Sequence, residues 1–349
     1  MDLGELVARA RVVALPLRER FRGIDTREAL LIEGENAVWA EWSPFVEYDD
    51  GEAARWLGSA LEVLTTGPLP ERAKRARVEC AAGAYRDLEG SPPPTIRVNA
   101  TVPAVSPDAV PGILDRFPGA RTAKVKVAER GQRLADDVAR VRAVREALGP
   151  AGRIRVDANA AWSLDEATTA LEALAPLDLE YAEQPVASVP DLAALRVRLA
   201  GAVRLAADES IRKPGDPLEV VRAGAADVIV LKLQPLGGRA RALEIARAAA
   251  AEADVAFVTS SALETSVGLA AAARLAHDVD IAFSSDLDHG LGTAALLAAD
   301  VSTEPLLPVD GRIGVRPVVA DPGLLERYAA PPERIAFWRA RLRRALRLA

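Results

Sequence analysis

The sequence predicts an α/β protein with a (β/α)8 TIM-type barrel preceded by a separate α+β module. From about residue 95 onward, short runs rich in β-branched residues alternate with amphipathic segments rich in alanine and arginine, which is typical of parallel strands joined by helices. The first 90 or so residues lack that alternation and favour antiparallel strands followed by helices. The length of 349 residues accommodates both parts.

The N-terminal module is expected over residues 1–92. Its antiparallel strands are predicted in RARVVALPLRERF and EALLIEGENAVWAEWSPF, which are joined across the loop RGIDT. Two helices are predicted in GEAARWLGSALEVL and PERAKRARVECAAGAYRDLE. The segment GSPPPT then marks the joint to the barrel.

The barrel is expected over residues 93–310. Its eight strands are predicted in TIRVNATV, AKVKV, RIRVDAN, LEYAEQP, RLAADES, DVIVLKLQ, VAFVTSS and DIAFSS. The intervening segments place apolar residues near every third or fourth position, as helices lying on a sheet require. Residues 311–349 end in a basic helix, PERIAFWRARLRRALRLA, which we expect to pack on the protein with a solvated arginine face.

The composition restricts the partners and the compartment. A net charge of −6 argues against a nucleic acid or an anionic membrane as the partner. No uncharged apolar run approaches the roughly 18 residues of a membrane helix, and the start MDLGELVARARVV does not have the form of an export signal. Together with the single cysteine, Cys80, these features favour a cytoplasmic protein that acts on a small molecule. They leave open whether it is a monomer or a homo-oligomer.

Lysine is rare in this chain and is found at selected positions. Only five of the 44 basic residues are lysines. Arginine stays protonated at any accessible pH, whereas a lysine can be shifted to release its proton. Lys124 and Lys126 share one face of a predicted strand, because side chains two apart point the same way. This pair therefore indicates proton-transfer chemistry.

Carboxylates end three successive predicted strands. Asp157, Glu183 and Asp208 follow one another at intervals of about 25 residues, one βα unit each, and Lys232 lies on the next strand. Because the carboxyl ends of barrel strands meet at one rim, these side chains are expected to converge. Three hard oxygen donors suit Mg²⁺, with Mn²⁺ as an alternative. Lysines beside such an ion would have depressed pKa values and could act as bases.

As a set, these motifs resemble the enolase superfamily in its muconate-lactonizing-enzyme subgroup, whose members use a Lys or His base with Mg²⁺ to stabilise an enediolate. The resemblance rests on Lys124-Val-Lys126, Asp157, Glu183, Asp208 and Lys232, in that order, and spans essentially the whole chain. It implies that the N-terminal module is a capping domain and that segment 311–349 returns to it.

Within that subgroup, the sequence is similar to the compact o-succinylbenzoate synthase family. The similarity lies in PLRERFRGIDTREALLIEG, AVWAEWSPF, VNATVPAV, TAKVKVAERGQ, VLKLQPLGG and SSALETSVGLA. It implies a hydro-lyase of menaquinone biosynthesis that converts the small carboxylate 2-succinyl-6-hydroxy-2,4-cyclohexadiene-1-carboxylate to o-succinylbenzoate. The implied reaction is a syn elimination through an enediolate.

The resemblance also implies roles for single residues. Lys126 would remove the proton beside the substrate carboxylate and then help to expel the hydroxyl, Lys232 would act as a cation, and Lys124 would orient Lys126. The metal ligands would be Asp157, Glu183 and Asp208, supported by Asn159 and Glu209. The substrate contacts would be Ser260, Ser261, Gly290 and, on a cap loop, Phe21 and Arg22.

Other functions remain open on the same core. Dipeptide epimerases bind the substrate ammonium with an Asp-x-Asp after the eighth strand, where Asp286-Leu287-Asp288 is expected to lie. N-acylamino-acid racemases need two opposed lysines, which are also present. Histidine-based racemases are disfavoured, because the two histidines, His277 and His289, do not follow the sixth or seventh strand. A non-catalytic ligand-binding barrel is the alternative outside enzymology.

Overall fold

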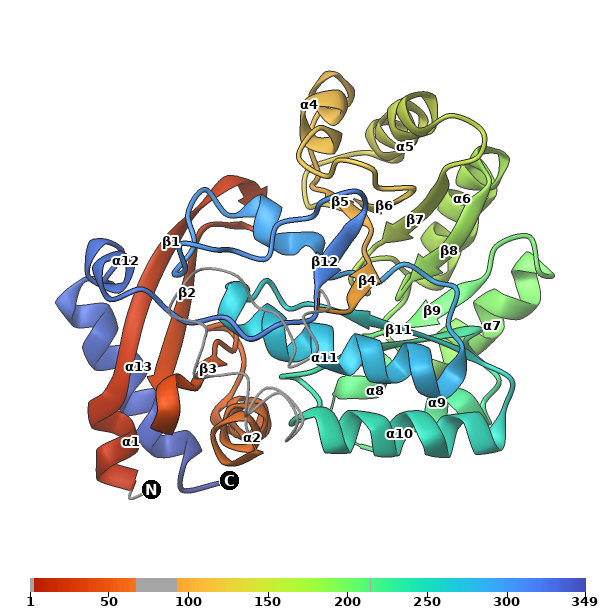
Figure 1. Ribbon diagram of the computed structural model, residues 1–349. Coiled ribbons are helices and arrows are strands. Elements are labelled where there is room, and N and C mark those ends of the chain that lie inside the picture. Colours follow the sequence, from red (N-terminus) through yellow and green to blue (C-terminus); the bar gives the residue numbers. More distant parts are fainter. Residues whose placement is uncertain (1–2, 67–92, 214) are drawn as a thin grey trace.

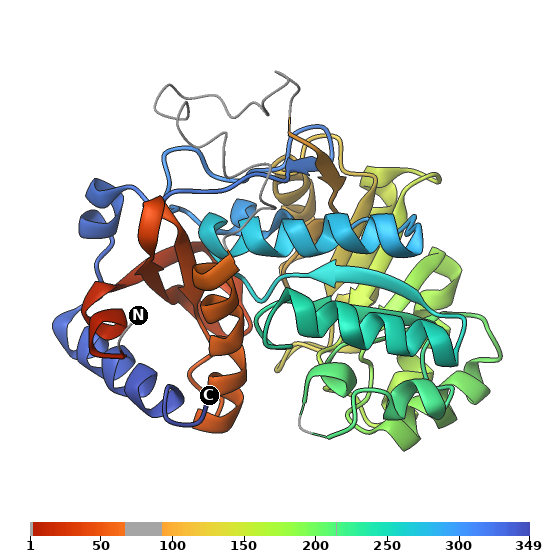
Figure 2. The same cartoon turned by 60° about the horizontal axis from the view of Figure 1, so that its bottom comes forward.

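The computed structural model describes residues 3–66, 93–213 and 215–349 (Figure 1). The described part consists of an antiparallel cap beside a curled parallel sheet with its helices, as Figure 2 shows from a second direction. The second predicted cap helix, with Cys80, lies outside the described residues.

The cap contains the antiparallel strands that the sequence predicts. They form a three-stranded sheet in the order β1-β2-β3, in which Leu15 pairs with Arg27 and Leu31 with Glu41. One face is apolar and buried, so the sheet needs a layer of helices against it. The described elements of this part are α1 (Leu3–Arg9), β1 (Ala10–Phe21), β2 (Ile24–Glu33), a 3-10 turn (Glu35–Ala37), β3 (Trp39–Trp42) and α2 (Asp50–Thr66).

Helices from the end of the chain cover this sheet. α12 (Pro322–Arg327) contacts β1, and α13 (Pro332–Ala345) contacts both β1 and α2, so Figure 1 shows the blue helices against the red strands. Trp338 is fully buried, meets Trp42 edge to face at 5.6 Å and donates its indole N–H to Glu28 at 2.9 Å. The basic helix predicted at the C-terminus is therefore a packed helix.

The parallel sheet contains seven strands in sequential order. The strands are β5 (Ala100–Val102), β6 (Thr122–Lys126), β7 (Arg153–Asp157), β8 (Leu179–Glu183), β9 (Leu205–Ala207), β10 (Val228–Lys232) and β11 (Ala256–Ser260). The helices around them are α4 (Val110–Leu114), α5 (Leu134–Leu148), α6 (Leu164–Leu174), α7 (Val189–Leu199), α8 (Glu209–Arg212), α9 (Glu219–Arg222), α10 (Arg239–Glu252) and α11 (Ser266–Phe283). Short 3-10 turns lie at Pro107–Ala109, Ala175–Leu177 and Gly292–Leu296.

The predicted eighth strand, at 280–285, is wrong. Residues 280–283 form the end of α11, whose N-cap is Thr265 and whose C-cap is Ser284, in a left-handed conformation with φ 51°. The helix buries Leu275, Ala276 and Val279 at helical spacing, and this packing overrides the β-like composition that follows. The barrel closes instead through residues 289–290, which form parallel bridges to Val98 and Ser260.

The first predicted strand is also divided. β4 (Thr95–Arg97) pairs antiparallel with β12 (Arg312–Gly314), whereas β5 belongs to the barrel sheet. The single predicted strand TIRVNATV thus contributes residues to two different sheets. Among the helices that the structure describes, none combines the length and the apolar character needed to cross a bilayer.

Candidate active site

The strand register places the principal site residues at one level. Lys126 pairs with Asp157, and Asp157 pairs with Glu183 across the next ladder. Glu183 in turn pairs with Ala206, so Asp208, two residues further on, points to the same face. These positions are the carboxyl ends of their strands, where active sites of parallel barrels lie.

Each of the three site lysines contacts a carboxylate. The closest Nζ–O distances are 2.9 Å for Lys124 to Glu183, 2.5 Å for Lys126 to Asp157 and 2.5 Å for Lys232 to Asp208. All six residues are buried. Three ammonium groups and three carboxylates cancel in charge, which makes burial of so many ions tolerable.

These pairs shift the pKa values in opposite directions. Burial, reinforced by the charge of Asp157, raises the pKa of Glu183 to about 6. Burial and the neighbouring lysines lower the pKa of Lys126, although Asp157 opposes them. Burial lowers the pKa of Lys124, but the carboxylates of Glu183 and Asp157 outweigh burial, so the pKa is raised. The sequence predicted a depressed pKa.

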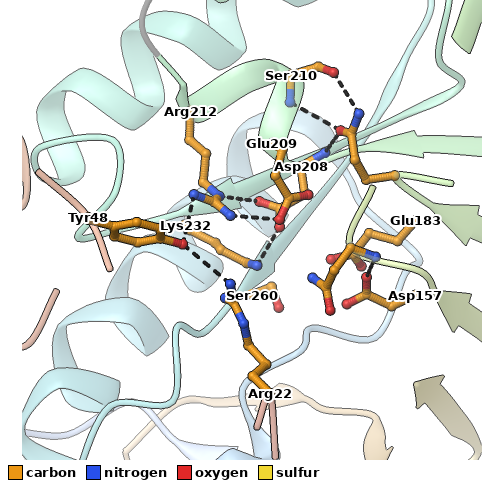
Figure 3. Close-up of polar contacts among 12 residues, drawn as sticks. Arg22, Tyr48, Asp157, Glu183, Asp208, Glu209, Ser210, Arg212, Lys232 and Ser260 are labelled. Atoms are coloured by element: carbon orange, nitrogen blue, oxygen red, sulfur yellow. Dashed lines mark hydrogen bonds and ion pairs between the residues drawn. The ribbon is translucent and has the colours of Figure 1, made fainter. Parts of the chain in front are cut away.

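Asn159 and Glu209, the two residues expected to support the metal ligands, contact other residues of the site. The backbone N–H of Asn159 donates to Asp157 at 3.0 Å, and its side-chain oxygen accepts from Lys126 at 2.6 Å. Glu209 accepts from Arg212 at 2.7 Å, and Arg212 also donates to Asp208 at 3.1 Å. Figure 3 shows Lys232 and Arg212 reaching Asp208 from two directions.

Sequence reasoning missed three further residues around Asp208. Arg212 is one, and Tyr48 of the cap is another, because its hydroxyl accepts from Arg212 at 3.4 Å and from Arg22 at 3.5 Å (Figure 3). The third is Gln184, whose side-chain oxygen accepts the N–H groups of Asp208 and Ser210. Only Gln184 had a sequence signal, since it directly follows Glu183.

One pocket brings the lysines together with the expected substrate contacts. Its lining includes the site residues Lys124, Lys126, Asp157, Asn159 and Lys232 and the expected contacts Phe21, Arg22, Ser260, Ser261 and Gly290. Its unexpected members are Phe45, Thr101, Ala262, Leu263 and Thr293. The Thr101 hydroxyl is buried and has no hydrogen-bond partner within the described chain, so it offers a polar atom to a ligand.

Asp286 and Asp288 do not join this pocket. They precede the closing bridges and lie at the opposite end of the barrel, near the first residues of β6 and β7. Asp288 accepts from Arg97 and from Thr122, each at 2.8 Å. The prediction that this pair follows an eighth strand is therefore wrong. The epimerase alternative rested on that prediction.

His289 is a structural residue of the closing segment. Its Nδ1 accepts the backbone N–H of Thr259 at 3.0 Å, and its Nε2 lies 3.0 Å from Asp280. The side chain is fully buried between these partners. His277 lies within α11.

The donor set suits a divalent cation in its chemistry. Asp157, Glu183 and Asp208 are buried carboxylates on neighbouring strands, and carboxylate oxygen is the ligand type that Mg²⁺ and Mn²⁺ prefer. As the side chains stand, no group of three or more acidic, histidine or cysteine side chains is gathered for metal binding within 3–66, 93–213 and 215–349. Each of the three carboxylates is turned to a lysine instead.

Two family models match the chain. The model described as enolase N-terminal domain-like matches residues 12–63, and the model described as enolase C-terminal domain-like matches residues 116–325. The o-succinylbenzoate synthase of Mycolicibacterium smegmatis is 51% identical over 343 residues, which is 96% of this chain and 94% of the relative. That of Mycobacterium marinum is 50% identical over 344 residues, 98% of this chain and 94% of the relative.

Solved structures share the fold at lower identity. A muconate lactonizing enzyme from Pseudomonas fluorescens matches with a TM-score of 0.73 at 21% identity, covering 92% of this chain and 98% of its own. The L-Ala-D/L-Glu epimerase from Bacillus subtilis matches with a TM-score of 0.66 at 24% identity, covering 89% and 96%. Both likenesses concern the cap-and-barrel fold.

Proposed function

The chain belongs to the o-succinylbenzoate synthase family of the enolase superfamily, and from this we propose that it dehydrates 2-succinyl-6-hydroxy-2,4-cyclohexadiene-1-carboxylate to o-succinylbenzoate. The observation that carries the proposal is about half identity to such synthases along nearly the whole chain. Lys124, Lys126, Lys232 and Asp157 line one pocket, and Glu183 and Asp208 contact Lys124 and Lys232 beside it, which supports the proposal. The product belongs to menaquinone biosynthesis.

Lys126 is the proposed base. Its Nζ lies in the pocket, held by Asp157 and Asn159 and 5.3 Å from the centre of the Phe21 ring. It takes the proton from the ring carbon beside the substrate carboxylate. The ammonium that results then returns a proton to the departing hydroxyl on the same face, which gives a syn elimination and balances the release of water.

Lys232 faces Lys126 from a distant strand of the barrel. It comes from β10, whereas Lys126 comes from β6, and both line the pocket. Its ammonium stabilises the negative charge that develops on the substrate carboxylate. Lys124, fixed by Glu183, stays cationic beside Lys126 and keeps it in position.

Asp157, Glu183 and Asp208 are the proposed ligands of the divalent cation, Mg²⁺ or Mn²⁺. When bound, the cation would supply further positive charge to the substrate carboxylate. The ligands would have to turn from their lysine partners toward it. Asn159 and the pair Glu209–Arg212 would then hold Asp157 and Asp208 through the contacts described above.

Arg22 is the proposed partner for the second carboxylate, on the succinyl tail. Its guanidinium lines the pocket and contacts the Tyr48 hydroxyl, and a guanidinium nitrogen lies 3.9 Å from a carboxylate oxygen of Glu47. Ser260, Ser261 and Gly290 line the same pocket. All of these residues belong to the cap and barrel of a single chain.

The test is loss of the cyclohexadiene absorbance after adding the purified protein with Mg²⁺. We expect rapid conversion to o-succinylbenzoate and no conversion in a chelated sample, with activity restored by added Mg²⁺ or Mn²⁺. A protein that binds the metal but leaves the chromophore unchanged would contradict the proposal.

A second activity is favoured by one observation, the placement of Lys126 and Lys232 on strands far apart around the barrel. Two lysines so placed can exchange a proton on either face of a substrate, as racemisation of N-acylamino acids requires. Deuterium exchange into both enantiomers would detect it. Dipeptide epimerisation loses its support, because Asp286 and Asp288 lie at the other end of the barrel.

A further inference from the structure

Arg27 is a buried arginine of the cap that reaches into the barrel. It lies on β2 and is 2% exposed. Its guanidinium donates to the backbone carbonyls of Leu263 at 3.0 Å and Ala262 at 3.2 Å, and also to the carbonyl of Ser43. Burying this charge is costly, so the contacts it makes with the segment after β11 call for an explanation.

That segment forms part of the pocket. Ser261, Ala262 and Leu263 all line it. Leu263 has a φ of 65°, a left-handed conformation that is unfavourable for a non-glycine residue. Such a conformation persists only where its surroundings hold it, and two of the carbonyls in this segment are held by Arg27.

The same guanidinium fixes an aromatic residue of the pocket. The Arg27 Cζ lies 4.4 Å from the centre of the Phe45 ring, and the Arg22 Cζ lies 4.5 Å from it. Phe45 lines the pocket and is 5% exposed. Cation–π contact with a buried ring is attractive, so Arg27 restrains the ring that Arg22 also contacts.

A third connection leads from Arg27 to the strand of Lys232. Ser43, whose carbonyl binds Arg27, donates its backbone N–H to Gln234 at 3.1 Å. Gln234 lies two residues after Lys232 and also contacts the Ser43 hydroxyl at 3.2 Å. Arg27 thus joins three pocket-forming segments: the loop after β11, the Phe45 segment and the end of β10.

We propose that Arg27 is a positioning residue that sets the shape of the pocket end away from the lysines and thereby governs binding of the succinyl tail. This deepens the proposed function and depends on it for the identity of the tail. Chemistry takes place at the lysines and carboxylates, so the rest of the substrate must lie against Phe45, Leu263 and their neighbours. Arg27 need not touch the substrate to select it.

The binding test compares two ligands that differ by the tail. Dissociation constants of o-succinylbenzoate and benzoate would be measured for the wild type, Arg27→Met, Arg27→Lys and the matched control Arg145→Met. Arg145 also donates to several backbone carbonyls, those of Leu177, Gly149 and Gly152 among them, but away from the pocket. We expect Arg27→Met to weaken o-succinylbenzoate at least tenfold and benzoate less than twofold, Arg27→Lys to recover part of the loss, and the control to change neither.

The structural test needs no ligand. Hydrogen–deuterium exchange of the peptide spanning 260–266 should be at least tenfold faster in Arg27→Met, while peptides of β7 and β8 keep their wild-type rates. Equal weakening of both ligands, or unchanged exchange at 260–266, would overturn the role of Arg27. If the wild type neither turned over the substrate nor bound o-succinylbenzoate, the proposed function would fail, and the exchange result would still decide whether Arg27 holds the loop.

Discussion

Lys126 illustrates why single residue types were informative in this sequence. A base must be able to lose its proton, and an arginine cannot, so a lysine in an arginine-rich chain predicts a position where the amine is needed. The period of two along a strand and the regular βα spacing then place the lysines and carboxylates at one rim. The positions of these residues could be predicted because each side chain is placed by the strand that carries it.

We expect Lys126→Ala to reduce kcat by about 10²–10⁴-fold, since it removes the base. Lys126→Arg should be similarly inactive, because a guanidinium does not release its proton. Stopped assays at saturating substrate would measure this. Lys213→Arg, an exposed lysine beyond α8, is the control and should keep wild-type kcat. Substantial activity in Lys126→Ala would assign the base elsewhere.

Phe45, Tyr48 and Arg27 could not be predicted as site residues. Tyr48 and Arg27 act through contacts between the cap and the barrel, with partners more than 160 residues apart in sequence for Tyr48 and Arg212 and more than 230 for Arg27 and Leu263. Phe45 is a cap residue that lines the pocket together with barrel residues. Nothing in the local pattern distinguishes such residues from ordinary core residues. Their function exists only in the assembled tertiary structure.

At the scale of elements, the closing segment of the barrel shows how composition can mislead. Residues 280–285 contain a short apolar run, Ile281-Ala282-Phe283, that resembles a strand, yet α11 continues through Phe283 because its buried face follows the helical period. The true closing bridges are formed by a histidine and a glycine, His289 and Gly290, which follow Asp286 and Asp288. Their pairing depends on long-range partners, His289 with Thr259 and Asp288 with Arg97.

Asp288→Asn should therefore affect stability rather than catalysis. Asp288 is 2% exposed, and its contacts with Arg97 and Thr122 join the closing segment to β4 and β6. Loss of the charge should lower the free energy of unfolding by about 1–3 kcal/mol and leave kcat/KM within about twofold. Urea unfolding and steady-state kinetics would be compared. A stable variant with strongly impaired turnover would place Asp288 in the reaction after all.

At the scale of the whole molecule, the cap and barrel meet through a buried carboxylate. Glu41 on β3 accepts the N–H groups of Thr265 and Gly268, at 3.0 and 3.1 Å, at the start of α11. This is a favourable place for negative charge. Burial and the nearby carboxylate of Glu264 destabilise the ionised form of Glu41 more than its hydrogen bonds stabilise it, and they raise the pKa of Glu41 from 4.5 to about 7.

The sign of the resulting pH dependence follows from the raised pKa. Below the ordinary glutamate pKa, folded and unfolded chains are both protonated at Glu41 and its contribution to stability is fully present. As the pH rises through about 7, the folded protein must carry a buried anion and that contribution is lost. We expect the free energy of unfolding to fall by on the order of 2 kcal/mol between about pH 5 and about pH 8.

Urea titrations of the wild type and Glu41→Gln at both pH values would measure this. In Glu41→Gln the fall in the free energy of unfolding between the two pH values should be smaller than in the wild type by on the order of 2 kcal/mol, because the Gln side chain does not titrate. Glu33→Gln, at an exposed position of the cap, serves as the control. Identical pH profiles of the wild type and Glu41→Gln would refute the assignment.

The packing of α13 on β1 and β2 has a consequence for the order of folding. Arg334 and Glu28, which contact each other, are 306 residues apart in sequence. Closing so long an unfolded loop costs entropy, but a barrel that has already folded brings its two flanks together and removes most of that cost. In a refolding experiment we therefore expect the barrel to form first, and enzymatic activity to return only when the last helix has joined strands made from the first part of the chain.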